Sequence, residues 1–193
     1  MQKLARSDLW TLETYAAERA TFRARVIEHK KPRRVALHPN ATLSFEDTMT
    51  IRYQVQEMLR VERIFEPAEI AAELEAYNPL IPNGTNWKAT FMIEFPDLDE
   101  RREALAAMPG VEHKVWAQVG DRQKLYAIAN EDMERSTDDK TAAVHFLRFE
   151  LDPVSAQAAK SGAAIRMGID HDRLRADVRL ADASRRSLVA DLA

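Results

Sequence analysis

Ten consecutive residues, NWKATFMIEF at positions 86–95, alternate between two kinds of side chain. The first set is apolar and consists of Trp87, Ala89, Phe91, Ile93 and Phe95; the second consists of Lys88, Thr90, Met92 and Glu94. A period of two is typical of a β-strand with one buried face. We therefore predict a strand whose first set faces the main core, with Lys88 and Glu94 on the other face of the sheet.

The rest of the chain mixes helical and extended patterns without a strict β–α alternation. Periodicity and capping residues predict helices over 7–31, with Ser7 or Asp8 as the N-cap, and over 47–64, 67–77, 97–108, 152–162 and 182–192. Short apolar runs between turn residues predict strands over 34–37, 42–45 and 141–151, and hairpins over 114–129 and 163–180. This order favours an α+β fold: one globular domain over 1–193, with a largely antiparallel sheet and the N-terminal helices packed against it.

Two predicted helices carry charged residues inside their apolar stripes. At about 100° per residue, Glu62 lands in the middle of the stripe of the second helix. That stripe is formed by Ile51, Val55 and Met58. On the first helix, Arg19 and Arg23 lie within the apolar stripe in the same way. An unpaired buried charge costs on the order of several kcal/mol, so we expect Glu62 to be buried as an ion pair with Arg19 or Arg23.

Three interpretations of this constellation are open. It can be a structural salt bridge that fixes how the two helices cross. Alternatively, the two arginines leave surplus positive charge in a partly enclosed site, which suits a carboxylate or phosphate ligand. In the third interpretation the helix ends early and Glu62 reaches water. The basic run 29–34 nearby can grip phosphate or an acidic partner, but such runs are usually solvated helix ends that complement the helix dipole.

Two histidines are the candidate metal ligands. His145 shares a predicted strand face with apolar residues, where neutral imidazole can ligate a metal or transfer protons. A lone histidine in such a setting is more often a hydrogen-bonded core residue, so we expect His145 to be buried and free of metal. His171 lies between two aspartates, but the three residues fall in a predicted hairpin turn, where turn chemistry alone accounts for aspartate. The spacing of these residues does not require a metal site.

Composition limits the classes of function. The chain has a net charge of −3 and a pI near 6.0, which argues against a dedicated nucleic-acid binder. Its 193 residues include no cysteine, so disulfides, thiolate metal sites and cysteine nucleophiles are excluded. No segment approaches the ~20 apolar residues of a membrane span, and the first residues lack the apolar run of a signal peptide. We expect a cytoplasmic protein that does not contact a membrane. The common motifs of nucleotide binding, zinc proteases and serine hydrolases are absent from the sequence.

Several stretches resemble an uncharacterised bacterial family, the domain of unknown function 3501. They are FRARVIEHKKPRRVALHPNATLSFED, RYQVQEMLRVERIFEPAEIAAELEAYNPLIPNGTN, KATFMIEFPD, DMERSTDDKTAAVHFLRFEL and the later GIDH. The resemblance implies a bacterial protein often encoded beside rubrerythrin and an iron–sulfur, heterodisulfide-reductase-like protein. It names neither a cofactor nor catalytic residues.

Three kinds of function follow from these observations. The first is a non-enzymatic accessory or binding protein in redox or peroxide defence, where any redox group belongs to a partner protein or to a site of histidine and carboxylate ligands. The second is a metal-dependent or anion-binding enzyme that uses carboxylates, arginines and His145 or His171. The third is an anion-binding regulator centred on Arg19 and Arg23.

Overall fold

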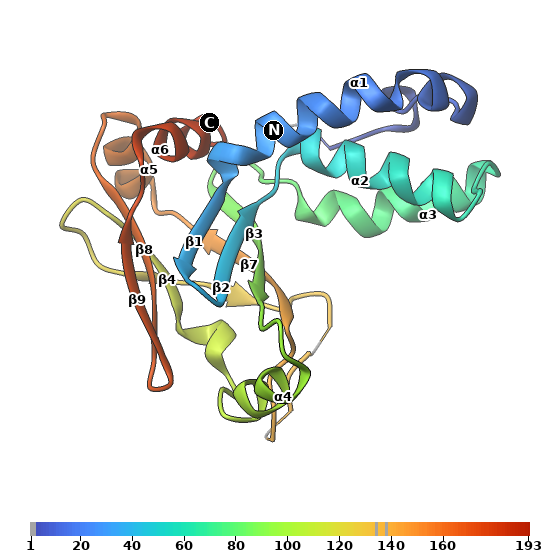
Figure 1. The fold of residues 1–193 in the computed structure, drawn as a ribbon. Coiled ribbons are helices and arrows are strands. Elements are labelled where there is room, and N and C mark those ends of the chain that lie inside the picture. The colour runs from blue at the N-terminus through green and yellow to red at the C-terminus, as the bar shows by residue number, and fades with distance from the viewer. Residues whose placement is uncertain (1–2, 134, 138) are drawn as a thin grey trace.

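The structure is a computed structural model that describes residues 3–133, 135–137 and 139–193. These residues form six α-helices and two antiparallel β-sheets (Figure 1), which confirms the predicted α+β class. The helices are α1 Leu12–Lys30, α2 Thr48–Val61, α3 Pro67–Tyr77, α4 Leu98–Ala106, α5 Pro153–Lys160 and α6 Asp182–Val189. The strands are β1 Arg34–His38, β2 Ala41–Phe45, β3 Asn86–Ile93, β4 Val115–Val119, β5 Leu125–Tyr126, β6 Ile128–Ala129, β7 Val144–Glu150, β8 Ile165–His171 and β9 Leu174–Arg179.

The strands divide between two sheets. The first has the order β1-β2-β3-β7-β6, the second has the order β5-β4-β8-β9, and the neighbouring strands run antiparallel. The predicted hairpin over 114–129 is only half correct. Strand β4 does pair with β5, but β6 leaves this sheet and pairs with β7 of the other, with the buried Ala127 between them. The chain therefore crosses from one sheet to the other within three residues.

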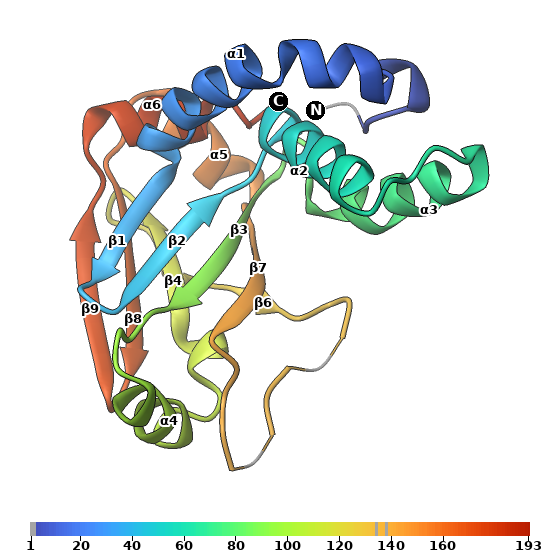
Figure 2. The same ribbon diagram turned by 45° about the vertical axis from the view of Figure 1, so that its right-hand side comes forward.

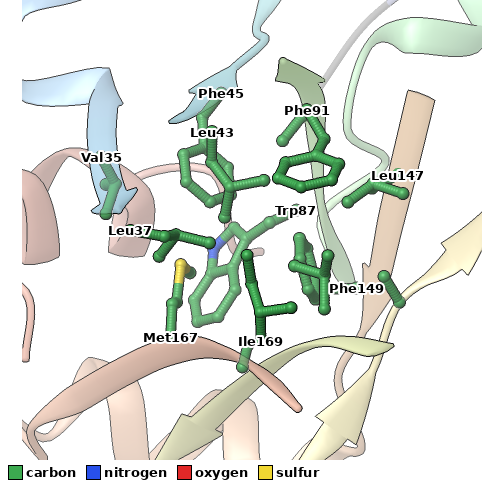
Figure 3. Packing of buried hydrophobic residues seen from close by; sticks show 14 of the residues in the cluster. Val35, Leu37, Leu43, Phe45, Trp87, Phe91, Leu147, Phe149, Met167 and Ile169 are labelled. Carbon is green, nitrogen blue, oxygen red and sulfur yellow. The ribbon is translucent and has the colours of Figure 1, made fainter. Parts of the chain in front are cut away.

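The main core lies between the two sheets and has Trp87 of β3 at its centre (Figure 3). Trp87 and Phe91 are fully buried, and the burial pattern of β3 alternates from Trp87 to Ile93. The indole Nε1 of Trp87 donates a hydrogen bond to the carbonyl of Leu188, 2.8 Å away, so its one polar atom is satisfied. The strand predicted from the period-two pattern is confirmed, although β3 ends at Ile93 and Phe95 is only partly buried.

Helices α1, α2 and α3 lie side by side beyond one end of the first sheet (Figure 2). They have apolar clusters of their own, one between α1 and α2 and one between α2, α3 and the N-terminal segment. Helix α1 begins later than predicted, because Thr11 and not Ser7 or Asp8 accepts the capping hydrogen bond, from the backbone N–H of Thr14. Residues Arg6–Asp8 form a separate short 3₁₀ turn.

A buried arginine joins the helices, the first sheet and the C-terminus. Arg33 is 2% exposed and donates two hydrogen bonds to Asp191, at 2.6 and 3.2 Å. Its Nε also lies 3.4 Å from Oδ2 of Asp47, the N-cap residue of α2. His29 approaches the same oxygen to 2.5 Å. The expectation of a solvated helix end over 29–34 is therefore wrong at Arg33, because the chain turns at this point and carries the side chain into the interior.

Candidate functional site

Arg19 has a different partner from the one predicted. Its Nε and Nη2 donate to the two carboxylate oxygens of Glu57 on α2, each at 2.7 Å. The hydroxyl of the buried Tyr15, one turn earlier on α1, donates to the same carboxylate at 2.5 Å. These bonds cross the contact between α1 and α2. The pKa of Glu57 falls to about 2, mainly because of the hydrogen bonds from Arg19.

The predicted burial of Glu62 is wrong. Glu62 is exposed, and the last buried position of α2 is Leu59. The helix ends at Val61, and Glu62 is its C-cap residue, followed by Arg63 in a left-handed conformation with φ 56°. The backbone thus leaves the helical path where the wheel would have placed Glu62 over the core. Arg23 is also exposed. The interpretation in which the helix ends early describes this region, and an anion site at Arg19 and Arg23 stays a prediction.

His145 is fully buried on β7, as predicted, and lies in a polar cluster. Its Nε2 is 3.0 Å from the carbonyl of Ala142 and 2.8 Å from the hydroxyl of Thr141. Because a carbonyl only accepts, the proton belongs on Nε2, and Nδ1 then accepts from the Asn130 amide at 3.1 Å. Burial lowers the pKa of His145, partly opposed by the nearby Glu112 carboxylate. A neutral imidazole satisfies this geometry.

Glu112 extends the cluster to an open pocket of about 560 Å³. This carboxylate is 1% exposed and accepts hydrogen bonds from Thr141, at 3.2 Å, and from the half-buried Ser136. Burial raises the pKa of Glu112, but the hydrogen bond from Ser136 and further favourable contacts outweigh it and leave the pKa below its ordinary value. Ser136 and Asn130 line the pocket. The sequence pattern indicates His145 but not Glu112, which lies in a short 3₁₀ turn with no distinctive pattern.

His171 is not part of a ligand cluster. It lies at the end of β8, and its Nδ1 accepts from the backbone N–H of Arg173 at 3.2 Å, a contact within the turn that leads to β9. The neighbouring Asp170 accepts from Lys124 and Tyr126 instead. Over the residues that the structure describes, no group of three or more His, Asp or Glu side chains is placed to hold a metal ion.

A second pocket lies on the outer face of the first sheet and is smaller, about 250 Å³. Its walls are mostly apolar and include Pro79 and Leu80 after α3, and Phe146 of β7. Two of the charged residues in its lining, Lys88 and Glu46, lie on adjacent segments of the sheet. Lys88 comes from β3, and Glu46 follows the end of β2 directly, where its backbone N–H donates to the carbonyl of Lys88 at 2.9 Å. Phe45 and Ala89, the preceding pair, are buried in the core, so Glu46 and Lys88 lie on the outer face.

Neither of these two charges has an ionic partner. The carboxylate of Glu46, 5% exposed, accepts from the hydroxyls of Thr50 at 2.6 Å and Thr90 at 3.0 Å. Lys88 donates to the carbonyl of Pro79. Among the described residues, no opposite charge lies within salt-bridge distance of either group. Burial lowers the pKa of Lys88 and the nearby guanidinium of Arg148 lowers it further, which outweighs the opposite effect of the Glu131 and Glu150 carboxylates.

Comparison with known proteins identifies the family. Residues 3–192 match the family described as "Protein of unknown function (DUF3501)". The chain belongs to this family. A crystal structure of a protein of unknown function from Burkholderia pseudomallei K96243 is 47% identical in sequence, covers 100% of both chains and superposes with a TM-score of 0.94. No curated protein matches the chain. None of the helices described in this family member is long and apolar enough to cross a membrane.

The sequence of this family member does not predict the pocket of Lys88 and Glu46, because neither residue is unusual in its local context. Lys88 fell on the polar side of a predicted strand and Glu46 directly precedes a helix N-cap, two places where charged residues are ordinary. Their proximity depends on the pairing of β2 with β3, and the apolar wall depends on the segment after α3. One sequence feature does point to Glu46. It directly precedes the N-cap residue Asp47, and a helix needs only one acidic residue for capping, so Glu46 is free for another role.

Proposed function

We propose that this DUF3501 family member is a non-enzymatic binding or accessory protein that holds a small ligand in the pocket of Lys88 and Glu46. One observation carries the proposal: a mostly apolar pocket contains two charged groups without ionic partners. Binding sites for small molecules typically combine apolar walls with a few polar groups that fix the orientation of the ligand. A buried charge without a partner raises the free energy of the empty protein, and a ligand of suitable charge relieves that cost.

We further propose that this role serves a cytoplasmic redox or peroxide-defence system. The support is the resemblance described above, which implies genes for rubrerythrin and an iron–sulfur protein nearby. The chain has no cysteine, so a cysteine-ligated cluster would belong to a partner protein and not to this chain. A strain that lacks the gene should then survive hydrogen peroxide less well than its parent. Equal survival would contradict the redox role but would leave the ligand-binding proposal unaffected.

The pocket proposal is tested by the thermal stability of the full chain in a panel of small anions, cations and zwitterions. A compound that binds the folded state raises the melting temperature. We expect at least one compound to stabilise the wild type but not Lys88→Met. Lys114→Met serves as the control, because Lys114 is exposed and lies away from the pocket lining. A panel without any shift, or a shift that Lys88→Met retains, would contradict the proposal.

The hydroxyl, carboxylate and imidazole groups around His145 favour a second candidate, an enzyme centred on Glu112. Ser136 faces an open pocket and donates to the buried Glu112, which Thr141 links to His145. This arrangement lets a carboxylate act on a hydroxyl at the pocket wall.

A serine-directed activity probe should then label wild type but not Ser136→Ala. Stoichiometric metal in protein purified without a histidine tag would instead favour the metal-dependent form, and a phosphate-induced thermal shift lost in Arg19→Ala would favour the anion site.

A further inference from the structure

The other charged groups around the small pocket form salt bridges with one another. Arg148 donates to Glu131 at 2.7 and 2.8 Å and to Glu150 at 2.5 Å. Asp132 pairs with Arg135, whose guanidinium lies over the ring of Phe146, 4.6 Å from its centroid. Among the described charged residues of the lining, only Glu46 and Lys88 then have no salt bridge, although the carboxylates of Glu131 and Glu150 act on Lys88 from a longer distance.

The two remaining groups have opposite charges and fixed positions. The hydroxyls of Thr50 and Thr90 hold the Glu46 carboxylate, and the carbonyl of Pro79 holds the Lys88 ammonium. Although the backbones of Glu46 and Lys88 are hydrogen-bonded, their charged groups do not approach within salt-bridge distance. A small ligand that carried both an ammonium and a carboxylate would pair each group with its complement. Charge-assisted hydrogen bonds of this kind are roughly twice as strong as neutral ones.

A ligand with a single charge fits this site less well. A monoanion paired with Lys88 would leave Glu46 without a cation and would bring a second negative charge close to it. A monocation paired with Glu46 would approach Lys88 in the same unfavourable way. The net charge of Glu46 and Lys88 together is zero, and a zwitterion also has a net charge of zero, so its binding buries no uncompensated charge.

We propose that the pocket binds a free α-amino acid with an apolar side chain. Its ammonium pairs with Glu46, its carboxylate pairs with Lys88, and its side chain packs against Leu80 and Phe146. The volume of about 250 Å³ suits a ligand of this size rather than a nucleotide or a peptide. This inference rests on the proposed ligand-binding function and specifies the class of ligand.

The test compares ligands that differ by one charged group. Calorimetric titration of the full chain uses L-leucine, 4-methylpentanoate, which lacks the amine, and 3-methylbutylamine, which lacks the carboxylate. Before the titration, a thermal-shift screen of the twenty L-amino acids shows which one stabilises the protein most. If this is not leucine, that amino acid and its own two analogues, one without the amine and one without the carboxylate, are titrated instead. We expect the amino acid to bind at least about tenfold more tightly than either analogue, which corresponds to one charge-assisted contact of about 1.4 kcal/mol.

Two substitutions assign the contacts. Lys88→Met should reduce the affinity for the amino acid at least about tenfold. In this variant the amino acid should bind no more tightly than the amine analogue, which lacks the carboxylate. In Glu46→Gln the amino acid should bind no more tightly than the carboxylate analogue, which lacks the amine. Lys114→Met and Glu94→Gln change exposed residues of the same types and should leave binding unchanged. Because Lys88 is only half-buried, its variant keeps the test informative even if Glu46→Gln fails to fold.

The possible failures are distinguishable. If the carboxylate analogue binds as tightly as the amino acid, and Lys88→Met abolishes both, the zwitterion inference is wrong and the pocket function stands. The same conclusion follows if no amino acid binds but another compound does so in a Lys88-dependent manner. If no compound binds at all, both the inference and the proposed function are overturned.

Discussion

Arg19 and Glu57 form a two-point contact between α1 and α2, with Nε bonded to Oε1 and Nη2 to Oε2, each at 2.7 Å. Such a paired geometry fixes direction as well as distance, because a planar guanidinium matches a carboxylate in only a few orientations. Tyr15 adds a third hydrogen bond to the same carboxylate from the buried side. The contact therefore fixes how the first two helices cross.

A double-mutant cycle on Arg19 and Glu57 should show strong coupling. Arg19→Met or Glu57→Gln alone leaves the other group without its partner, while the double substitution removes both, so the combined loss of stability should be smaller than the sum of the two. Denaturant titration measures the free energies of unfolding. The control is Glu62→Gln, which should change stability by no more than about 0.5 kcal/mol because Glu62 is exposed. Additive effects would show that the contact does not stabilise the fold.

Stability should fall in acid partly because of Glu57. Its pKa is lowered from 4.5 to about 2 in the folded state, mainly by Arg19, so the folded protein holds this carboxylate ionised more readily than the unfolded chain does. The resulting stabilisation is fully present above about pH 4.5 and is lost as the pH falls through the folded pKa. Unfolding free energies measured between pH 7 and pH 2 should decline less steeply for Glu57→Gln than for the wild type. Identical slopes would contradict the depressed pKa.

Arg33 and Arg34 offer a matched pair of adjacent arginines. Arg33→Ala leaves the buried carboxylate of Asp191 without its cation and that of Asp47 with His29 alone, and should cost about 3–5 kcal/mol of stability. Arg34→Ala should cost less than about 1 kcal/mol, because Arg34 is exposed and its pairing with Glu94 lies at the surface. Chemical denaturation of the two variants provides the measurement. If both variants lose the same free energy of unfolding, the buried ion pairs of Arg33 stabilise the fold no more than the surface pair of Arg34 does.

Phe91→Ala should cost about 3–5 kcal/mol, because Phe91 is fully buried between the sheets and its removal leaves a cavity. Met92→Ala, at the next position of the same strand, should cost less, since Met92 lies on the outer face and is only partly buried. Thermal and denaturant unfolding of both variants tests the two faces of β3 together. A larger loss in Met92→Ala would reverse the assignment of these faces.

Local patterns were enough to identify most elements. The strict alternation over 86–95 fixed the buried face of β3, and Pro67 fixed the start of α3, because a proline is favoured in the first turn of a helix. The apolar face of β7 correctly predicts that His145 is buried. The periodic pattern predicts the end of α2 three residues too late, because the pattern continues past Val61 while the backbone leaves the helix.

The sequence by itself determined the α+β class, the faces of the strands and the burial of residues on those faces, such as Phe91 and His145, because these properties depend on neighbours within a few positions. Only the tertiary structure decided which charges meet. Arg19 reaches Glu57 because of the angle at which α1 crosses α2, and Glu46 comes beside Lys88 because of the register between β2 and β3. Arg33 is buried only because α6 brings Asp191 back to the start of the sheet. At the edge of an apolar face, a charged side chain can point to solvent or to the interior with little difference in local conformational energy. Whether it is buried depends on a partner of opposite charge, which can be more than a hundred residues away in the sequence.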